Sequence, residues 1–206
     1  MHPKVLDPAA WSVVKSLDKL GLLQGWVLAG GTGLALQLGH RRSEDLDLFS
    51  TGTFNSGDLL ERLSNAGKIT VQDRGGSTLH AMVESVRVSF LSAQAPFLFP
   101  GTLYRGLNLA DPRDIAVMKL VAIGGRGSRK DFVDLYFYLQ SGGDFAQALL
   151  WLEKRFVSID YNSYHIVKSL TWFDDAEEEP MPRMIKDVSW SQIKKTITRE
   201  ARRLSP

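Results

Sequence analysis

Two aspartates separated by a single residue are the strongest candidates for chemistry in this sequence. Asp45 and Asp47 alternate with Leu46 and Leu48 within the segment Glu44–Phe49. A period of two is typical of a strand, which would place both carboxylates on one face, about 7 Å apart at Cα. Carboxylates at this spacing can share a hard divalent cation such as Mg²⁺ or Mn²⁺. We therefore predict that Asp45 and Asp47 are metal ligands and catalytic residues.

A pair of glycines precedes the aspartates by about 15 residues. Glycines let backbone N–H groups approach a phosphate closely, and a helix expected to begin just after them would add a favourable dipole. A cation and a hydroxyl between the glycines and the aspartates could contact a triphosphate. The sequence thus predicts a site for a nucleoside triphosphate (NTP) with Mg²⁺, formed by Gly30, Gly31, Thr32, Arg42 and Ser43.

Each feature is weak alone, because a strand, two glycines and a helix usually form an ordinary turn. The order G-G-T-x-L-A-L at 30–36 and H-R-x-S-x-D-L-D-L-F at 40–49, however, resembles the nucleotidyltransferase superfamily, and specifically the AbiEii/AbiGii toxin family. K-x-x-A-x-x-x-R at 119–126 and K-D-x-x-D-L at 130–135 resemble further motifs of that family. The resemblance covers roughly residues 20–195. It implies an α+β fold with a mixed sheet and flanking helices, and a place among bacterial abortive-infection and toxin–antitoxin systems.

The downstream motifs add a lysine and an aspartate to the predicted site. Lys119 lies on an otherwise apolar helix and could enter a cleft, where it would meet a phosphate as a compact point charge. Asp131 could orient Lys119 or Arg126, or take part in the chemistry. We predict Lys119 and Asp131 as catalytic and Arg126 as nucleotide-binding. Alternatively, Lys119–Asp131 or Arg126–Asp134 is a buried ion pair that joins two helices.

A third carboxylate is missing from the predicted sheet. Many nucleotidyltransferases carry one on a later strand, where it binds a second metal or acts as a base. In this sequence Ser89 stands at that place, and a neutral hydroxyl is a poor ligand and a poor base. Glu84 is a candidate to replace this third carboxylate. A single metal ion is therefore expected, and the missing carboxylate favours nucleotide binding without turnover.

The elements that must position these residues fall into two parts. Residues 1–100 are expected to form an α+β core and residues 101–206 a helical region, with the active site in the cleft between them. Helices are expected at 8–20, 32–38, 57–66, 112–123, 130–140, 144–156, 161–170 and 191–204. Strands are expected at 26–29, 44–49, 68–72, 78–84 and 86–91, with a Gly-rich link at 124–129.

Composition narrows the classes of function. The 206 residues include no cysteine, which excludes disulfides, thiolate metal sites and cysteine nucleophiles. No apolar stretch is long enough for a membrane span, so we expect a cytoplasmic protein without a membrane partner. Net charge is only +2, but residues 183–206 carry seven Lys/Arg against two acids. That segment is either an RNA-binding surface, together with Arg126, Arg129 and Lys130, or a solvated helix face.

The sequence leads to three hypotheses of function. In the first, the protein transfers a nucleoside monophosphate from an NTP to an acceptor hydroxyl. The family resemblance suggests RNA, and the 3′ end of tRNA in particular, as acceptor, and a cognate antitoxin as partner. In the second, the protein is a degenerate nucleotidyltransferase that binds nucleotide or RNA without turnover. In the third, the acceptor is a protein hydroxyl.

Overall fold

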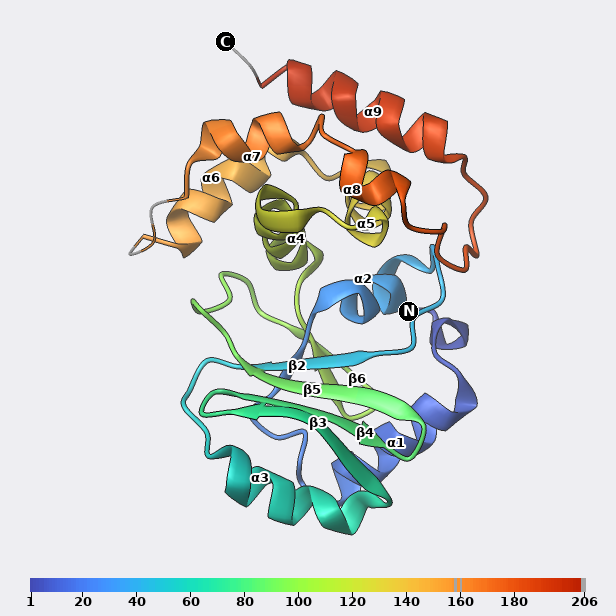
Figure 1. The fold of residues 1–206 in the computed structure, drawn as a ribbon, viewed down its shortest axis with the longest axis vertical. Coiled ribbons are helices and arrows are strands. Elements are labelled where there is room, and N and C mark those ends of the chain that lie inside the picture. Colours follow the sequence, from blue (N-terminus) through green and yellow to red (C-terminus); the bar gives the residue numbers. More distant parts are fainter. Residues whose placement is uncertain (158, 160, 205–206) are drawn as a thin grey trace.

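A computed structural model describes residues 1–157, 159 and 161–204. The chain folds into two stacked parts (Figure 1): a sheet with helices α1 and α3 below it, and a helical part formed by α4–α9 above it. Helix α2 lies between the two. The α+β class and the helical C-terminal half predicted from the sequence are confirmed.

One mixed sheet of seven strands organises the lower part. Its order is β3-β4-β5-β2-β1-β7-β6, and β2 runs parallel to β5 but antiparallel to β1. The strands are β1 (Val27–Leu28), β2 (Leu46–Ser50), β3 (Ile69–Gly75), β4 (Thr78–Val83), β5 (Val86–Ser92), β6 (Thr102–Tyr104) and β7 (Leu107–Leu109).

The helices begin where the sequence supplies caps. The Asp7 carboxylate accepts a hydrogen bond from Ala9 N, and the Asp111 carboxylate accepts one from Arg113 N; each precedes a proline at the first helical position. The α-helices are α1 (Pro8–Lys19), α2 (Gly30–Leu38), α3 (Ser56–Leu63), α4 (Pro112–Arg126), α5 (Arg129–Gln140), α6 (Phe145–Arg155), α7 (Ser163–Ser169), α8 (Asp174–Glu177) and α9 (Trp190–Arg202). Two short 3₁₀ helices cover Pro3–Val5 and Ser64–Ala66.

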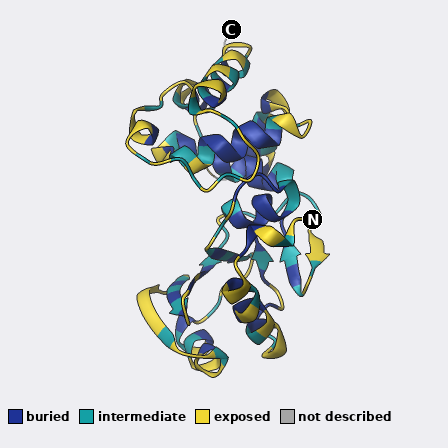
Figure 2. Cartoon of the chain, turned by 90° about the vertical axis from the view of Figure 1, so that its right-hand side faces the viewer, coloured by how far each residue is buried: buried dark blue, intermediate teal, exposed yellow. Residues whose placement is uncertain are grey.

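Each part has its own apolar core. One core joins α1 and α3 to the sheet, and the other lies among α4–α7 and α9. A small third cluster of Ala29, Leu34, Ala110 and Ile115 connects them beneath α2. In Figure 2 the buried residues fill the interior of both parts, and exposed residues cover the outer faces of the helices. Among the described residues, no helix is both long and apolar enough to span a bilayer.

Several predicted boundaries were wrong. Helix α2 starts at Gly30, so the glycine pair forms its first turn instead of preceding it. Strand β2 starts at Leu46, which leaves Asp45 just before it. Helix α3 begins at Ser56, one residue before the predicted start, and the side chain of its cap Asn55 accepts from Gly57 N and Asp58 N.

Two features of residues 101–206 also differ from the prediction. The segment 124–126, predicted as a Gly-rich link, is the last turn of α4. Strands β6 and β7 follow residue 100, and β7 pairs in parallel with β1, so the sheet extends into the half expected to be helical.

Candidate active site

A cavity of about 330 Å³ opens where the sheet part meets the helical part. It is lined by residues of α2 and the loop into β2, by residues around the α4–α5 connection, and by a C-terminal segment. The lining residues are Gly31, Thr32, Arg41, Arg42, Ser43, Glu44, Asp45, Asp47, Lys119, Ser128, Lys130, Asp131, Met181, Pro182 and Arg183. The predicted site residues lie together here, except for two. Gly30 lies against Asp47 but is not part of the lining, and the exposed Arg126 also lies outside it.

The glycine pair makes room for two charged side chains. Gly30 has φ +60°, and a Cβ added to it would lie 2.9 Å from Asp47 Oδ2. A Cβ added to Gly31 would overlap the guanidinium of Arg41. Both positions therefore require glycine, and the left-handed backbone at Gly30 adds a second reason. The glycines let the start of α2 approach the carboxylate and the guanidinium of the site.

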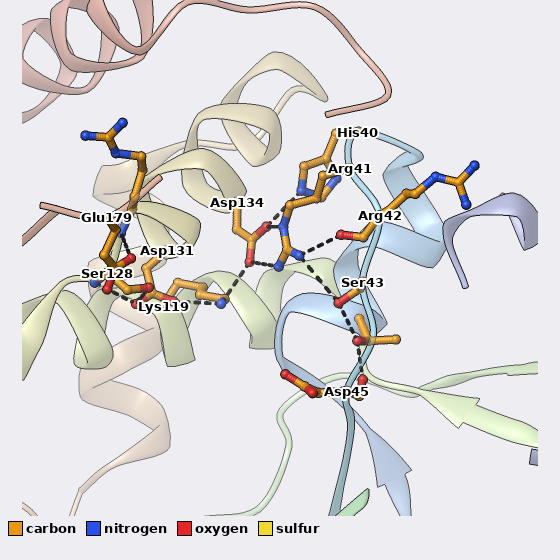
Figure 3. Close-up of polar contacts among 12 residues, drawn as sticks. His40, Arg41, Arg42, Ser43, Asp45, Lys119, Ser128, Asp131, Asp134 and Glu179 are labelled. Atoms are coloured by element: carbon orange, nitrogen blue, oxygen red, sulfur yellow. Dashed lines mark hydrogen bonds and ion pairs between the residues drawn. The ribbon is translucent and has the colours of Figure 1, made fainter. Parts of the chain in front are cut away.

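Two hydroxyls fix the segment that leads to Asp45. The Thr32 hydroxyl donates a hydrogen bond to the backbone carbonyl of Asp45, and it lies 2.7 Å from Ser43 Oγ. Because the Thr32 proton goes to that carbonyl, the Ser43 hydroxyl is the donor to Thr32. These bonds tie α2 to the loop before β2, as Figure 3 shows. In this structure Thr32 and Ser43 thus position the aspartates.

The two predicted metal ligands sit at the start of β2. Burial raises the pKa of Asp47, the negative charge of Asp45 raises it further, and a hydrogen bond from Ser89 opposes both effects. A cation between the carboxylates would relieve this excess of negative charge. Among the described residues, no group of three or more His, Asp or Glu side chains could hold a metal. The donor set therefore fits one Mg²⁺ that keeps waters and substrate phosphates as its other ligands.

Asp134 is the centre of a buried polar network beside the cavity (Figure 3). Its Oδ1 accepts from His40 Nε2 at 2.8 Å and Arg41 Nε at 2.7 Å. Its Oδ2 accepts from Arg41 Nη2 at 3.0 Å and lies 2.8 Å from Lys119 Nζ. Burial alone would raise the pKa of Asp134, but the charges of Lys119 and Arg41 and the hydrogen bonds lower it well below its usual value.

Lys119 joins α4 to α5 at the edge of the cavity. Its Nζ donates to Asp131 Oδ1 at 2.7 Å as well as contacting Asp134. Burial would lower the pKa of Lys119, but the two carboxylates outweigh that effect and raise it. Asp131 also accepts from Ser128 N and Ser128 Oγ in a capping box at the start of α5. The alternative pair Lys119–Asp131 is therefore present, whereas Asp134 pairs with Arg41, His40 and Lys119 rather than with Arg126.

A C-terminal strap, residues 181–186, crosses from the helical part to the loop before β2. Arg42 N donates to Arg183 O at 2.8 Å, and the N–H groups of Ile185 and Lys186 donate to His40 O at 2.9 and 3.0 Å. Arg183 Nη1 lies 3.2 Å from Glu44 Oε1 at the cavity mouth, and both side chains are largely exposed. The strap therefore adds a cation to the rim.

Ser89 lies in register with Asp47 on the neighbouring strand β5. Its hydroxyl lies 2.9 Å from Nδ1 of His80 on β4. Glu84 is in the turn between β4 and β5, where its side chain accepts from Lys68 N at 2.9 Å. Glu84 therefore does not replace the missing third carboxylate.

The basic residues predicted as an RNA-binding surface are divided among different places. Lys130 and Arg183 line the cavity. Arg129 instead donates to the carbonyl of Ala176 at 2.7 Å and pairs with Glu177, which also binds Lys194 of α9. Lys194 and Arg199 of α9 are thus paired with Glu177 and Glu200.

Part of the chain matches a known protein family. Residues 13–99 match the family model for the nucleotidyl transferase AbiEii toxin of type IV toxin–antitoxin systems. The whole chain is also similar to the uncharacterized protein aq_aa25 of Aquifex aeolicus (strain VF5), with 32% identity over 196 residues and 92% of each chain covered. The chain belongs to the AbiEii nucleotidyltransferase toxin family. The matched segment contains the glycine pair, both aspartates and Ser89.

Solved structures show the same fold for this AbiEii family member. The nucleotidyltransferase toxin MenT4 (Rv2826c) of Mycobacterium tuberculosis superposes with a TM-score of 0.63 at 16% identity, covering 94% of this chain and 80% of MenT4. JHP933 from Helicobacter pylori superposes with a TM-score of 0.50 at 18% identity, covering 98% of this chain and 94% of its own. The similarity extends over both parts of the fold, so the helical half belongs to the shared architecture.

Proposed function

We propose that this AbiEii family member transfers a nucleoside monophosphate from an NTP to an acceptor hydroxyl with the help of Mg²⁺. One observation carries the proposal: a single cavity brings together the start of α2, the two aspartates of the D-x-D motif and Lys119. Residues far apart in the sequence meet there around a space of about 330 Å³. Such a concave site between two parts of a fold is typical of small-molecule binding.

The cavity supplies charge for a triphosphate and a metal ion. Arg42, Lys130 and Arg183 are exposed cations at its rim, and Lys119 lies deeper. These groups would bind phosphate oxygens. Asp45 and Asp47 would hold Mg²⁺, which would neutralise the negative charge that develops on the phosphates.

The reaction follows from this arrangement. The oxygen of the acceptor hydroxyl forms a bond to the α-phosphorus, and the bond from that phosphorus to the bridging oxygen breaks. Pyrophosphate leaves with the bond's electron pair, and the hydroxyl proton passes to a base. The cations of the rim stabilise the charge on the departing pyrophosphate.

RNA, and the 3′ end of tRNA in particular, is the proposed acceptor. The exposed cations at the cavity rim are suited to a phosphate backbone, and modification of that end would block translation. This outcome fits the toxin description of the AbiEii family. The type IV toxin–antitoxin description likewise supports an antitoxin protein as the cognate partner.

Ser89 supports a second candidate function, which is nucleotide or RNA binding without turnover. A hydroxyl stands in register with Asp47 where a third carboxylate is expected. A protein hydroxyl is the alternative acceptor.

A labelling experiment tests the proposed function. The protein is incubated with Mg²⁺, total tRNA and each of the four α-³²P-labelled NTPs in turn, and the RNA and protein fractions are separated. We expect label in RNA that is lost when EDTA is added. Label in protein would favour the protein acceptor, and NTP binding without label in either fraction would favour the degenerate function.

Substitution of Asp47 should separate binding from folding. Because the pKa of Asp47 is raised by burial and by Asp45, its ionised form destabilises the metal-free protein. We expect Asp47→Asn to raise the free energy of unfolding slightly at pH 7, and less as the pH falls toward 4. The same variant should lose Mg²⁺-dependent NTP binding, measured by calorimetry. Unchanged NTP affinity in both Asp45→Asn and Asp47→Asn would contradict the proposed metal site.

A further inference from the structure

Three polar side chains form a row across the sheet beside the cavity. Asp47 on β2 is in register with Ser89 on β5, and Ser89 is in register with His80 on β4. Neighbouring strands lie about 4.8 Å apart, and residues in register point to the same face. His80 is therefore two strands away from Asp47, on the same face of the sheet.

This face of β4 is the one that the lower core leaves uncovered. Leu79, Ala81 and Val83 are fully buried in the core with α1 and α3. His80 alternates with them and is only partly buried, whereas Ser89 beside it is 2% exposed. The imidazole is thus partly exposed beside a buried hydroxyl, on the same face of the sheet as Asp47 and two strands from it.

The contact between Ser89 and His80 engages one ring nitrogen and leaves the other available. Ser89 stands in register between Asp47 and His80, so its proton can point to the Asp47 carboxylate, which accepts when ionised. The Ser89 oxygen then accepts from Nδ1–H of His80, 2.9 Å away. In this tautomer Nε2 carries the lone pair and can accept a proton.

The other carboxylates that line the cavity are already engaged, and Glu44 pairs with Arg183 at the mouth. Lys119 is protonated because Asp131 and Asp134 hold its charge. Asp134 already accepts from His40, Arg41 and Lys119, and Asp131 is shared between Lys119 and Ser128. Asp45 and Asp47 are the proposed metal ligands. The third carboxylate of a two-metal arrangement is replaced by Ser89.

We infer that His80, oriented by Ser89, is the general base of the proposed nucleotidyl transfer. Nε2 of His80 takes the proton from the acceptor hydroxyl as its oxygen bonds to the α-phosphorus and pyrophosphate departs with the electron pair of the broken bond. Ser89 is a positioning residue that orients the imidazole through its contact with Nδ1. The inference rests on the proposed function and assigns the acceptor to the partly exposed face of β4 at His80.

Two variants of His80 test this role. His80→Gln removes the base, and we expect kcat to fall about 10²–10⁴-fold, the usual contribution of general-base catalysis. Calorimetry measures the affinity for an α,β-methylene NTP analogue in the presence of Mg²⁺. This affinity should change less than about twofold, because His80 and Ser89 do not line the cavity. In His80→Ala, added imidazole should restore part of the lost kcat, since a free base can occupy the vacated space.

His165 supplies a matched control. It is an exposed histidine of α7 whose Nε2 lies 2.8 Å from the carbonyl of Gly124, remote from the row. His165→Gln should retain wild-type kcat and gain nothing from imidazole.

The outcomes that overturn the inference are distinct from those that overturn the function. Wild-type kcat in His80→Gln would refute the role of His80 alone. A loss of kcat that imidazole does not rescue, together with weakened NTP-analogue binding, would show a structural role and also refute it. If the wild-type protein transfers no nucleotide to any acceptor, the proposed function fails, and this inference fails with it.

Discussion

Replacement of Asp134 by asparagine is expected to destabilise the protein by about 3–5 kcal/mol, the usual cost of breaking a buried ion pair from one side. Asp134 is fully buried, and its two oxygens accept from His40, Arg41 and Lys119. Asparagine has one acceptor oxygen, and its amide would point N–H groups at cations that are already donors. Urea unfolding at pH 7 measures the difference.

The dependence of this difference on pH gives an independent check. Because the folded pKa of Asp134 is well below its unfolded value of 3.8, its contribution to stability is complete above about pH 4. It is lost only as the pH falls further, toward the folded pKa. The gap between wild type and Asp134→Asn should therefore be constant from pH 5 to 7 and shrink in stronger acid.

The exposed Asp187 provides a control for the substitution itself. Asp187→Asn should change the free energy of unfolding by no more than about 0.5 kcal/mol. If Asp134→Asn behaves like this surface control, the network around Asp134 does not hold the two parts of the fold together.

The fold was predictable where local signals are strong. The Asp-Pro pairs before α1 and α4 combine a cap with a residue whose φ suits a helix, so both starts were predicted correctly. Strands β6 and β7 were missed because each has three residues, too few to show a period of two. Helix α4 continues through the glycines near its end, since one turn of an established helix tolerates them at a cost of about 1 kcal/mol each.

The site was predictable only in its local parts. Asp45 and Asp47 are recognisable because their spacing is itself the signal. The role of Asp134 was missed because its partner Arg41 is 93 residues away, and no pattern in either segment states that they meet. Both residues stand within the motifs that carry the family resemblance, which was the one available clue. The strap has no motif, and its place depends on backbone hydrogen bonds to His40 and Arg42.

Lys119 is expected to act in both the fold and the reaction, and two variants separate these roles. Lys119→Met leaves the Asp131 carboxylate without its cation, and the Asp131 side chain is only 13% exposed. We expect a loss of about 3 kcal/mol in the free energy of unfolding. Transfer should fall about 10²–10³-fold, comparable to the loss of one group that stabilises transition-state charge.

The double variant Lys119→Met/Asp131→Gln removes both charges while preserving the start of α5, because glutamine can also complete a capping box. Asp134 keeps Arg41 and His40 as donors. Stability should therefore return to within about 1 kcal/mol of wild type, since the removal of both charges of a buried pair costs far less than the removal of one. Transfer should stay as low as in Lys119→Met, because no cation has been returned to the phosphates.

Unfolding in urea and transfer to RNA, the latter assayed at a temperature where each variant is folded, give the two readouts. Lys168→Met, a change at an exposed lysine of α7, is the matched control and should alter neither. Recovery of transfer together with stability in the double variant would show that Lys119 is structural only. Full transfer by Lys119→Met would remove Lys119 from the mechanism, and the phosphates would then depend on Arg42, Lys130 and Arg183 at the cavity rim.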